Sequence, residues 1–159
     1  MKRGSIVFLK IVILLIAVVT LAALLWEPQL EGVNAHATNF EIYFKDPFLA
    51  LVYAGSIPFF IALYQTFKVL EYTRQNNVFS QMTLKAVRTI KYCAIAIICF
   101  VAAEELFIML NHGSDDPAGG VFMGIIITFG SLVIATVATV FEKILRNAVD
   151  MKSENDLTI

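Results

Sequence analysis

The chain has 159 residues, of which 58% are hydrophobic and 16% are charged, and its formal net charge is −1. A soluble domain is about 45–50% apolar and about 25% charged, so this composition excludes an ordinary soluble protein and predicts an integral membrane protein. The length leaves room for one compact membrane domain over residues 1–159 and for no second domain.

A helix needs about 20 apolar residues to cross the hydrocarbon core of a bilayer. Four stretches meet this requirement, at residues 5–26, 48–70, 91–110 and 121–145. The first follows Lys2 and Arg3 and ends at Trp26, before Glu27 and Pro28 and without a small-residue cleavage site, so we expect an uncleaved helix. The predicted fold is therefore all-α, with four transmembrane helices.

The connection between the first two spans, residues 27–47, ends in an aromatic segment. Phe40, Tyr43 and Phe44 recur at helical spacing just before the second span. This spacing favours a short amphipathic element that lies at the membrane interface.

The middle connection carries a helix start and many cations. Ser80, preceded by Phe79, is a suitable N-cap for a helix that opens at Gln81 and runs into the third span. Of the 12 Lys and Arg residues, only Lys45 falls outside the N-terminal segment, this connection and the C-terminal segment. The positive-inside rule then places both termini and the middle connection in the cytoplasm.

Glu104 and Glu105 interrupt the third span near its outer end. A carboxylate inside a span is costly and is by default a hypothesis of function. Proton or cation handling, or a polar ligand pocket, is one interpretation; a protonated or hydrogen-bonded carboxyl that joins helices is the other. Adjacent residues point about 100° apart on a helix, so we expect one to face the bundle and the other the headgroups.

The fourth span carries a stripe of small residues at Ser131, Ala135 and Thr139. Small residues four apart allow another helix to approach closely. The stripe predicts packing within the chain, with a homodimer as the alternative.

Beyond the fourth span we expect an amphipathic cytoplasmic helix and a tail, residues 146–159. Its apolar face is predicted from residues that recur at helical spacing, namely Phe141, Ile144, Leu145, Ala148 and Met151.

No motif in the sequence indicates an enzyme. It contains no Gly-rich phosphate loop, nucleophile elbow or His-Glu-x-x-His, and the loop residues His36 and His112 have no convincing metal-ligand spacing. We therefore expect no catalytic residue, no metal and no cofactor.

Two segments resemble a known family. Residues 77–90 (Asn-Val-Phe-Ser-Gln-Met-Thr-Leu-Lys-Ala-Val-Arg-Thr-Ile) and the tail 152–159 (Lys-Ser-Glu-Asn-Asp-Leu-Thr-Ile) are similar to the cytoplasmic loop and acidic tail of a bacterial membrane family, domain of unknown function 2975. The four-span layout is similar along nearly the whole chain.

The resemblance implies a location in the bacterial plasma membrane and a small helix-turn-helix regulator as partner, since such regulators are encoded beside similar proteins. The chain itself would bind lipid and not nucleic acid. The partner-binding residues would lie in the two cytoplasmic segments: Phe79, Ser80, Glu154, Asp156, Leu157, Thr158 and Ile159.

Two other functions remain open. The aromatic outside connection favours a protein that gives immunity against a peptide or protects against envelope stress. Glu104 and Glu105 favour a small transporter linked to protons or ions.

Overall fold

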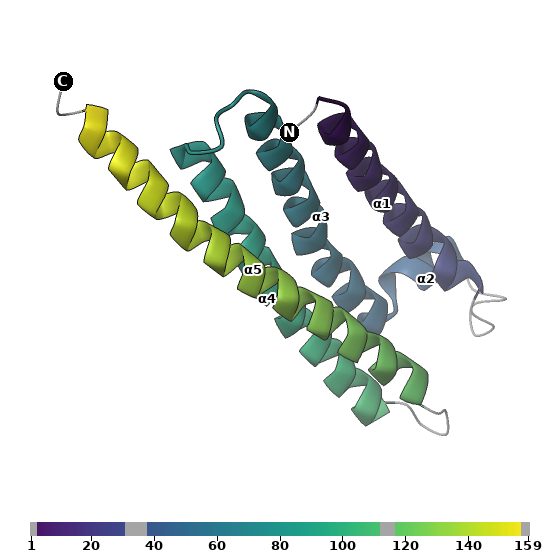
Figure 1. Cartoon of the computed structure of the whole chain (residues 1–159). Coiled ribbons are helices and arrows are strands. Elements are labelled where there is room, and N and C mark those ends of the chain that lie inside the picture. Colours follow the sequence, from purple (N-terminus) through teal and green to yellow (C-terminus); the bar gives the residue numbers. More distant parts are fainter. Residues whose placement is uncertain (1–2, 31–37, 112–116, 157–159) are drawn as a thin grey trace.

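The computed structural model describes residues 3–30, 38–111 and 117–156. Over these residues the chain forms five helices and no strand, shown in Figure 1: α1 (Arg3–Leu30), α2 (Asn39–Phe44), α3 (Pro47–Arg74), α4 (Gln81–Asn111) and α5 (Ala118–Asp156). All except α2 are long and apolar enough to cross a membrane. The expectation of an all-α chain with four candidate spans is therefore confirmed.

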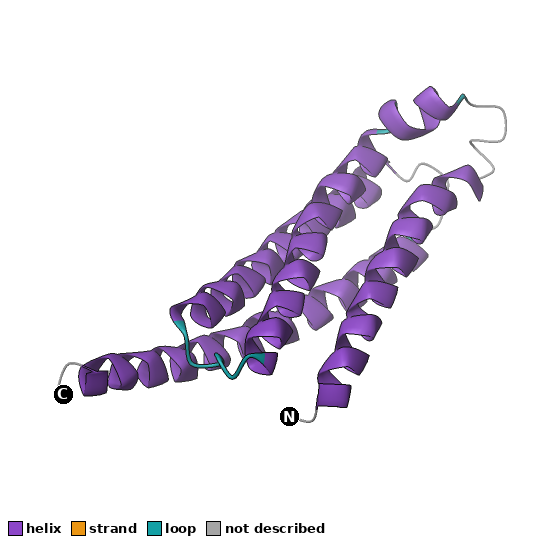
Figure 2. Cartoon of the chain, turned by 90° about the horizontal axis from the view of Figure 1, so that it is seen from above, coloured by secondary structure: helices purple, strands orange, loops and turns teal. Residues whose placement is uncertain are grey.

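The long helices pack mainly in chain order. Helix α1 lies against α3, α3 against α4, and α4 against α5. Both termini and the α3–α4 connection lie at one end of the molecule, and α2 lies at the other, as Figures 1 and 2 show. We call these the terminal end and the α2 end.

Local capping fixes where α3 and α4 begin. Asp46 Oδ1 accepts a hydrogen bond of 2.8 Å from the Phe48 backbone N–H. Ser80 Oγ accepts one of 3.3 Å from the Thr83 backbone N–H, which confirms Ser80 as an N-cap. The Thr83 side chain is only 1% exposed and donates to the Asn77 carbonyl at 3.0 Å, so it binds the connection to the first turn of α4.

Helices α4 and α5 meet along a seam with the spacing of a coiled coil. Buried residues recur at intervals of three, four or seven, as expected when two helices pack knobs into holes. They are Leu84, Val87, Ala94 and Val101 on α4, and Gly124, Ser131, Ala135, Ala138, Glu142, Leu145 and Val149 on α5.

The predicted small-residue stripe follows this seam only in part. Ser131 and Ala135 are buried, whereas Thr139 is exposed and its hydroxyl donates to the Ala135 carbonyl at 2.7 Å. Ala138 takes the next buried position. A seam whose steps alternate between four and three residues stays on one face of the helix, while steps of four drift off it.

The segment predicted as a C-terminal amphipathic helix is helical and continuous with the fourth span, because α5 runs without a break to Asp156. Its expected apolar face is divided. Leu145 is buried in the seam, whereas Phe141 and Ile144 are each 54% exposed and Met151 is 62% exposed.

Helix α2 occupies the predicted aromatic segment and is attached to α1. The Tyr43 hydroxyl donates to the Leu25 carbonyl at 2.7 Å, and Ile42 is buried. Phe40 and Phe44 are exposed, and their rings stack with centroids 5.2 Å apart.

Candidate functional site

Glu104 and Glu105 lie near the α2 end of α4 and approach two different neighbouring helices. A Cβ built on Gly55 of α3 would lie 3.1 Å from Glu104 Oε1. A Cβ on Gly124 of α5 would overlap the Glu105 carboxyl group. The two glycines therefore leave room for the carboxyl groups. Both glutamates face neighbouring helices, whereas the sequence predicted this for only one of them.

Two adjoining cavities lie around these carboxyl groups. The carboxylate cavity has a volume of about 580 Å³ and is lined by Glu104, Glu105, Gly120 and Gly124, among others. The apolar cavity has a volume of about 290 Å³ and extends from Glu104 toward α1. They share four lining residues, Val52, Val101, Glu104 and Ile127.

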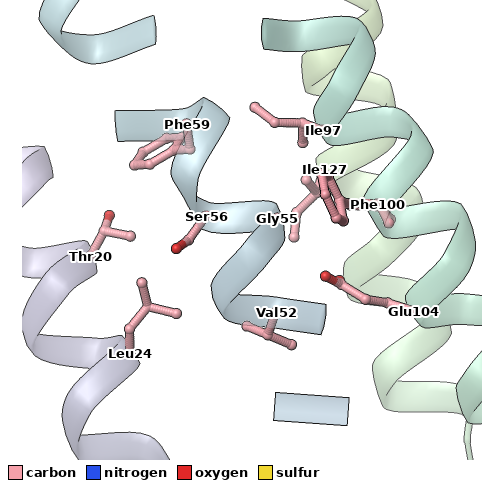
Figure 3. Close-up of a pocket in the computed structure, with 11 residues that line it drawn as sticks. Thr20, Leu24, Val52, Gly55, Ser56, Phe59, Ile97, Phe100, Glu104 and Ile127 are labelled. Carbon is pink, nitrogen blue, oxygen red and sulfur yellow. The ribbon is translucent and has the colours of Figure 1, made fainter. Parts of the chain in front are cut away.

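The apolar cavity is formed where all four long helices come together. Figure 3 shows Glu104 reaching from α4 toward Gly55 of α3, with Thr20 and Leu24 entering from α1 on the other side. The Ser56 hydroxyl on this wall already donates to the Tyr53 carbonyl at 2.8 Å. Among the residues that line this cavity, Glu104 is the only ionisable one.

Neither Glu104 nor Glu105 makes a hydrogen bond or an ion pair with any residue that the structure describes. The hydrogen-bonded form of the helix-joining interpretation needs a partner, and the described residues supply none for either glutamate. The same part of the chain contains no group of three residues able to hold a metal ion. What the geometry offers is a pair of half-buried carboxyl groups beside an apolar space.

At the terminal end, in contrast to Glu104 and Glu105, a buried carboxyl group is surrounded by cationic partners. Glu142 of α5 is 7% exposed and accepts from Arg88 Nε at 2.8 Å and Lys91 Nζ at 2.6 Å, both from α4. Arg146 lies 3.5 Å from the same carboxylate. The cluster joins α4 to α5 where the seam approaches the terminal end.

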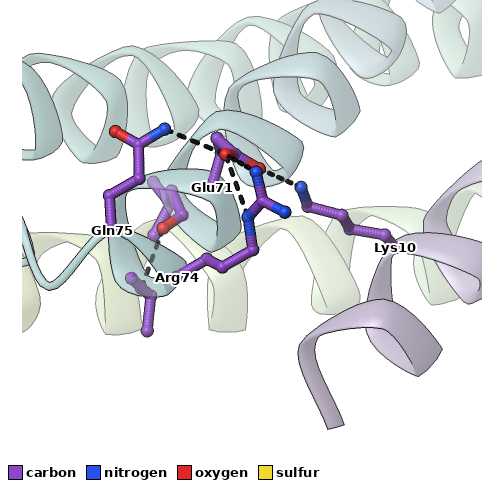
Figure 4. A network of polar contacts seen from close by, with 6 residues as sticks. Lys10, Glu71, Arg74 and Gln75 are labelled. Atoms are coloured by element: carbon purple, nitrogen blue, oxygen red, sulfur yellow. Dashed lines mark hydrogen bonds and ion pairs between the residues drawn. The ribbon is translucent and has the colours of Figure 1, made fainter. Parts of the chain in front are cut away.

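A second polar cluster joins α1 to α3. Figure 4 shows Glu71 of α3 between Lys10 of α1 and its own neighbours Arg74 and Gln75. Arg74 Nη2 lies 2.6 Å from Glu71 Oε1. The sequence alone did not pair Lys10 with Glu71. The available signal was an acidic residue at the end of a span, opposite a lysine near the start of another.

The residues predicted to bind a partner gather at the terminal end. Phe79 is 55% exposed, beside Ser80, whose hydroxyl caps α4. Glu154 is exposed on the last turns of α5, and Asp156 is the final residue of that helix. Leu157, Thr158 and Ile159 lie outside the described residues, as do His36 and His112.

Comparison with known proteins places this arrangement in a family. Over the whole of both chains, the sequence is 40% identical to a protein of Bacillus subtilis (strain 168) that bears the name "Uncharacterized membrane protein YoaS". No solved structure matches. Residues 31–159 match the family described as "Protein of unknown function (DUF2975)". Together with the four membrane-length helices, these matches show that the chain belongs to the DUF2975 family of membrane proteins.

Proposed function

We propose that the chain is a non-enzymatic regulatory protein that holds a small helix-turn-helix transcription regulator at its terminal end, on the cytoplasmic face of a bacterial plasma membrane. One observation carries the proposal, namely the reach of α5. Among the described side chains Val149 is the last buried one, yet the helix continues to Asp156. Figures 1 and 2 show this end projecting past the α3–α4 connection.

The C-terminal part of α5, from Phe141 to Met151, has an apolar face suited to binding in a groove, and Met151 carries this face onto the projecting end. Phe141, Ile144 and Met151 are exposed and recur at intervals of three and seven, so they form one apolar stripe beside the buried seam. An apolar helix face is a common ligand for a hydrophobic groove on a partner. Exposed Glu154 adds negative charge, which complements the basic surface of a DNA-binding domain.

The α3–α4 connection adds a second contact at the same end. Phe79 is exposed directly before the capped start of α4, and the Ser80 and Thr83 hydroxyls are engaged with the local backbone. Phe79 is therefore the residue of this connection that we propose for partner contact, with Ser80 holding its position.

A truncation tests the proposal. The chain truncated after Asp150 keeps buried Val149 and loses the tip of α5, so the membrane part should fold as before. We expect a small DNA-binding protein, identified by mass spectrometry, to co-purify with the full chain and not with the truncated one. Once purified, that protein should bind the full chain in detergent and not the truncated form. If neither form recovers a DNA-binding protein, the proposal fails.

A pair of single substitutions refines the test. Met151→Glu places a charge on the apolar stripe and should abolish binding of the purified regulator. Asp150→Asn alters an exposed residue off the stripe and should leave binding unchanged. Equal binding by both variants would exclude the stripe as the contact surface.

A further inference from the structure

The two cavities around Glu104 together have the form of a site for an elongated molecule. They share Val52, Val101 and Ile127 in addition to Glu104, so they adjoin. Small-molecule sites have volumes of about 300–1,000 Å³. The carboxylate cavity, at about 580 Å³, lies within this range, and the apolar cavity, at about 290 Å³, lies just below it. This inference concerns the α2 end and does not depend on the proposed function at the terminal end.

The apolar cavity suits a hydrocarbon chain. Its lining from α1, α3, α4 and α5 consists mainly of aliphatic and aromatic side chains, among them Leu24, Phe59, Ile97 and Phe100. At about 30 Å³ for each water-sized group, a volume of 290 Å³ holds roughly ten methylene-sized groups.

The carboxylate cavity suits a positively charged head. Glu104 and Glu105 both line it, and no described residue pairs with either of them. An uncompensated charge at membrane depth is costly, and such residues normally pair. Gly124 leaves the space that the Glu105 carboxyl group occupies, because a Cβ there would overlap it, and a Cβ at Gly55 would crowd the Glu104 carboxyl group at 3.1 Å.

We propose that the two cavities bind an amphipathic organic cation. Its apolar tail lies between α1, α3 and α4, and its ammonium head lies against Glu104 and Glu105. Charge complementarity selects the head, and the apolar lining selects the tail. Small inorganic cations fit less well, because the two carboxyl groups have no third metal-ligating residue beside them in the described part of the chain.

Equilibrium dialysis tests the proposal with the full chain in phosphatidylcholine nanodiscs and radiolabelled decyltrimethylammonium as the probe. Binding to empty nanodiscs is subtracted, which removes simple partition into lipid. We expect saturable binding of one probe per chain. Decyl sulfate has the same tail with the opposite charge and should not bind; tetramethylammonium has the charge without the tail and should bind at least tenfold more weakly. Equal binding of either probe would overturn the proposal.

Variants locate the site. Glu104→Gln should weaken binding of decyltrimethylammonium at least tenfold, while Glu41→Gln, at an exposed carboxylate of α2, should leave it unchanged. Val52 lines both cavities, so Val52→Trp places a large ring in the space between them and should also abolish binding. Circular dichroism and gel filtration confirm that each variant is folded. If folded Glu104→Gln and Val52→Trp bind like the unchanged chain, the site is not here.

Discussion

At the scale of single residues, Gly124 stands out among the described glycines. The position that its Cβ would take lies closer to a side chain of another helix, that of Glu105, than for any other of them. Gly130, six residues further along α5, has nothing within 4 Å of the position that a Cβ would take. The two glycines share a helix and differ in their surroundings. They therefore separate a packing effect from the intrinsic cost of glycine in a helix.

We predict that Gly124→Ala destabilises the protein by about 1–3 kcal/mol, because the new methyl group displaces the Glu105 carboxyl group. Gly130→Ala should be neutral or slightly stabilising, since alanine favours a helix over glycine by about 1 kcal/mol. Thermal unfolding of the purified chain in detergent measures both. Adding Glu105→Ala to Gly124→Ala should restore the midpoint; an unrestored midpoint would show that another contact causes the loss.

Glu142 provides a second prediction at this scale, because it is the buried anion among three cations. Glu142→Gln leaves Arg88 and Lys91 without their counter-charge, and we expect a loss of about 1–3 kcal/mol. Asp150→Asn removes a carboxylate from the exposed side of the same helix and should change stability little. Unfolding midpoints of the two variants give the comparison. Equal midpoints would mean that solvent or lipid headgroups replace the lost partner.

At the scale of elements, the sequence predicted the helices well and their contacts less well. Apolar runs give the four spans, and Ser80 gives the start of α4, because hydrophobic length and capping are local properties. The α4–α5 seam is harder to predict, since nearly every residue of a span is apolar and the buried side does not stand out. The four-residue spacing correctly identified Ser131 and Ala135 as buried, but it then predicted Thr139. The next buried residue of the seam is Ala138.

The pairing of Glu142 with Arg88 and Lys91 shows the same difficulty for polar residues. Each was visible in the sequence as a charge near the end of a span, but the partner of each lies on another helix, more than 50 positions away. Only the packing of α4 on α5 brings them together. The cavities around Glu104 were unpredictable for the same reason, because they depend on glycines of two other helices.

Helix α2 yields a prediction about pH. Hydrogen bonds from Lys45, and then from the Thr38 backbone and side chain, lower the pKa of Glu41 from 4.5 to about 2. A carboxyl group with a lowered pKa stabilises the folded form above its unfolded pKa and loses that effect as the pH falls through the folded value. We therefore expect α2 to lose stability between about pH 4.5 and about pH 2.

Hydrogen exchange of the amides of residues 40–45, corrected for the intrinsic effect of pH, measures this change. Glu41→Gln cannot titrate, so its protection should stay constant over the same range and lie below that of the unchanged chain at neutral pH. Thr38→Ala removes the N-cap and the hydrogen bond from the Thr38 hydroxyl to the Glu41 carboxylate, but keeps the titrating group and its bond from Lys45. Its pH dependence should therefore persist over a narrower range. A pH dependence that persists in Glu41→Gln would assign the effect to another residue.

At the scale of the whole molecule, the terminal end and the α2 end differ in charge and in chemistry. The terminal end has paired charges, a packed seam and a projecting helix. The α2 end has one surface ion pair, Glu41–Lys45, and also two carboxyl groups without a partner among the described residues, the cavities and exposed aromatic rings. The proposed partner and the proposed cation therefore act at opposite ends of the same helices.

The orientation of these ends in the membrane is the last prediction. Lys45 is the only one of the 12 Lys and Arg residues that lies in a connection at the α2 end, so the positive-inside rule places that end outside the cell. In a chain with Cys93 and Cys99 replaced by alanine, Lys45→Cys should react with a membrane-impermeant maleimide in intact cells. Gln75→Cys, at the terminal end, should react only after the membrane is permeabilised. The cysteine-free parent gives the background, and the reverse pattern of labelling would place the proposed regulator-binding face outside the cell and exclude it.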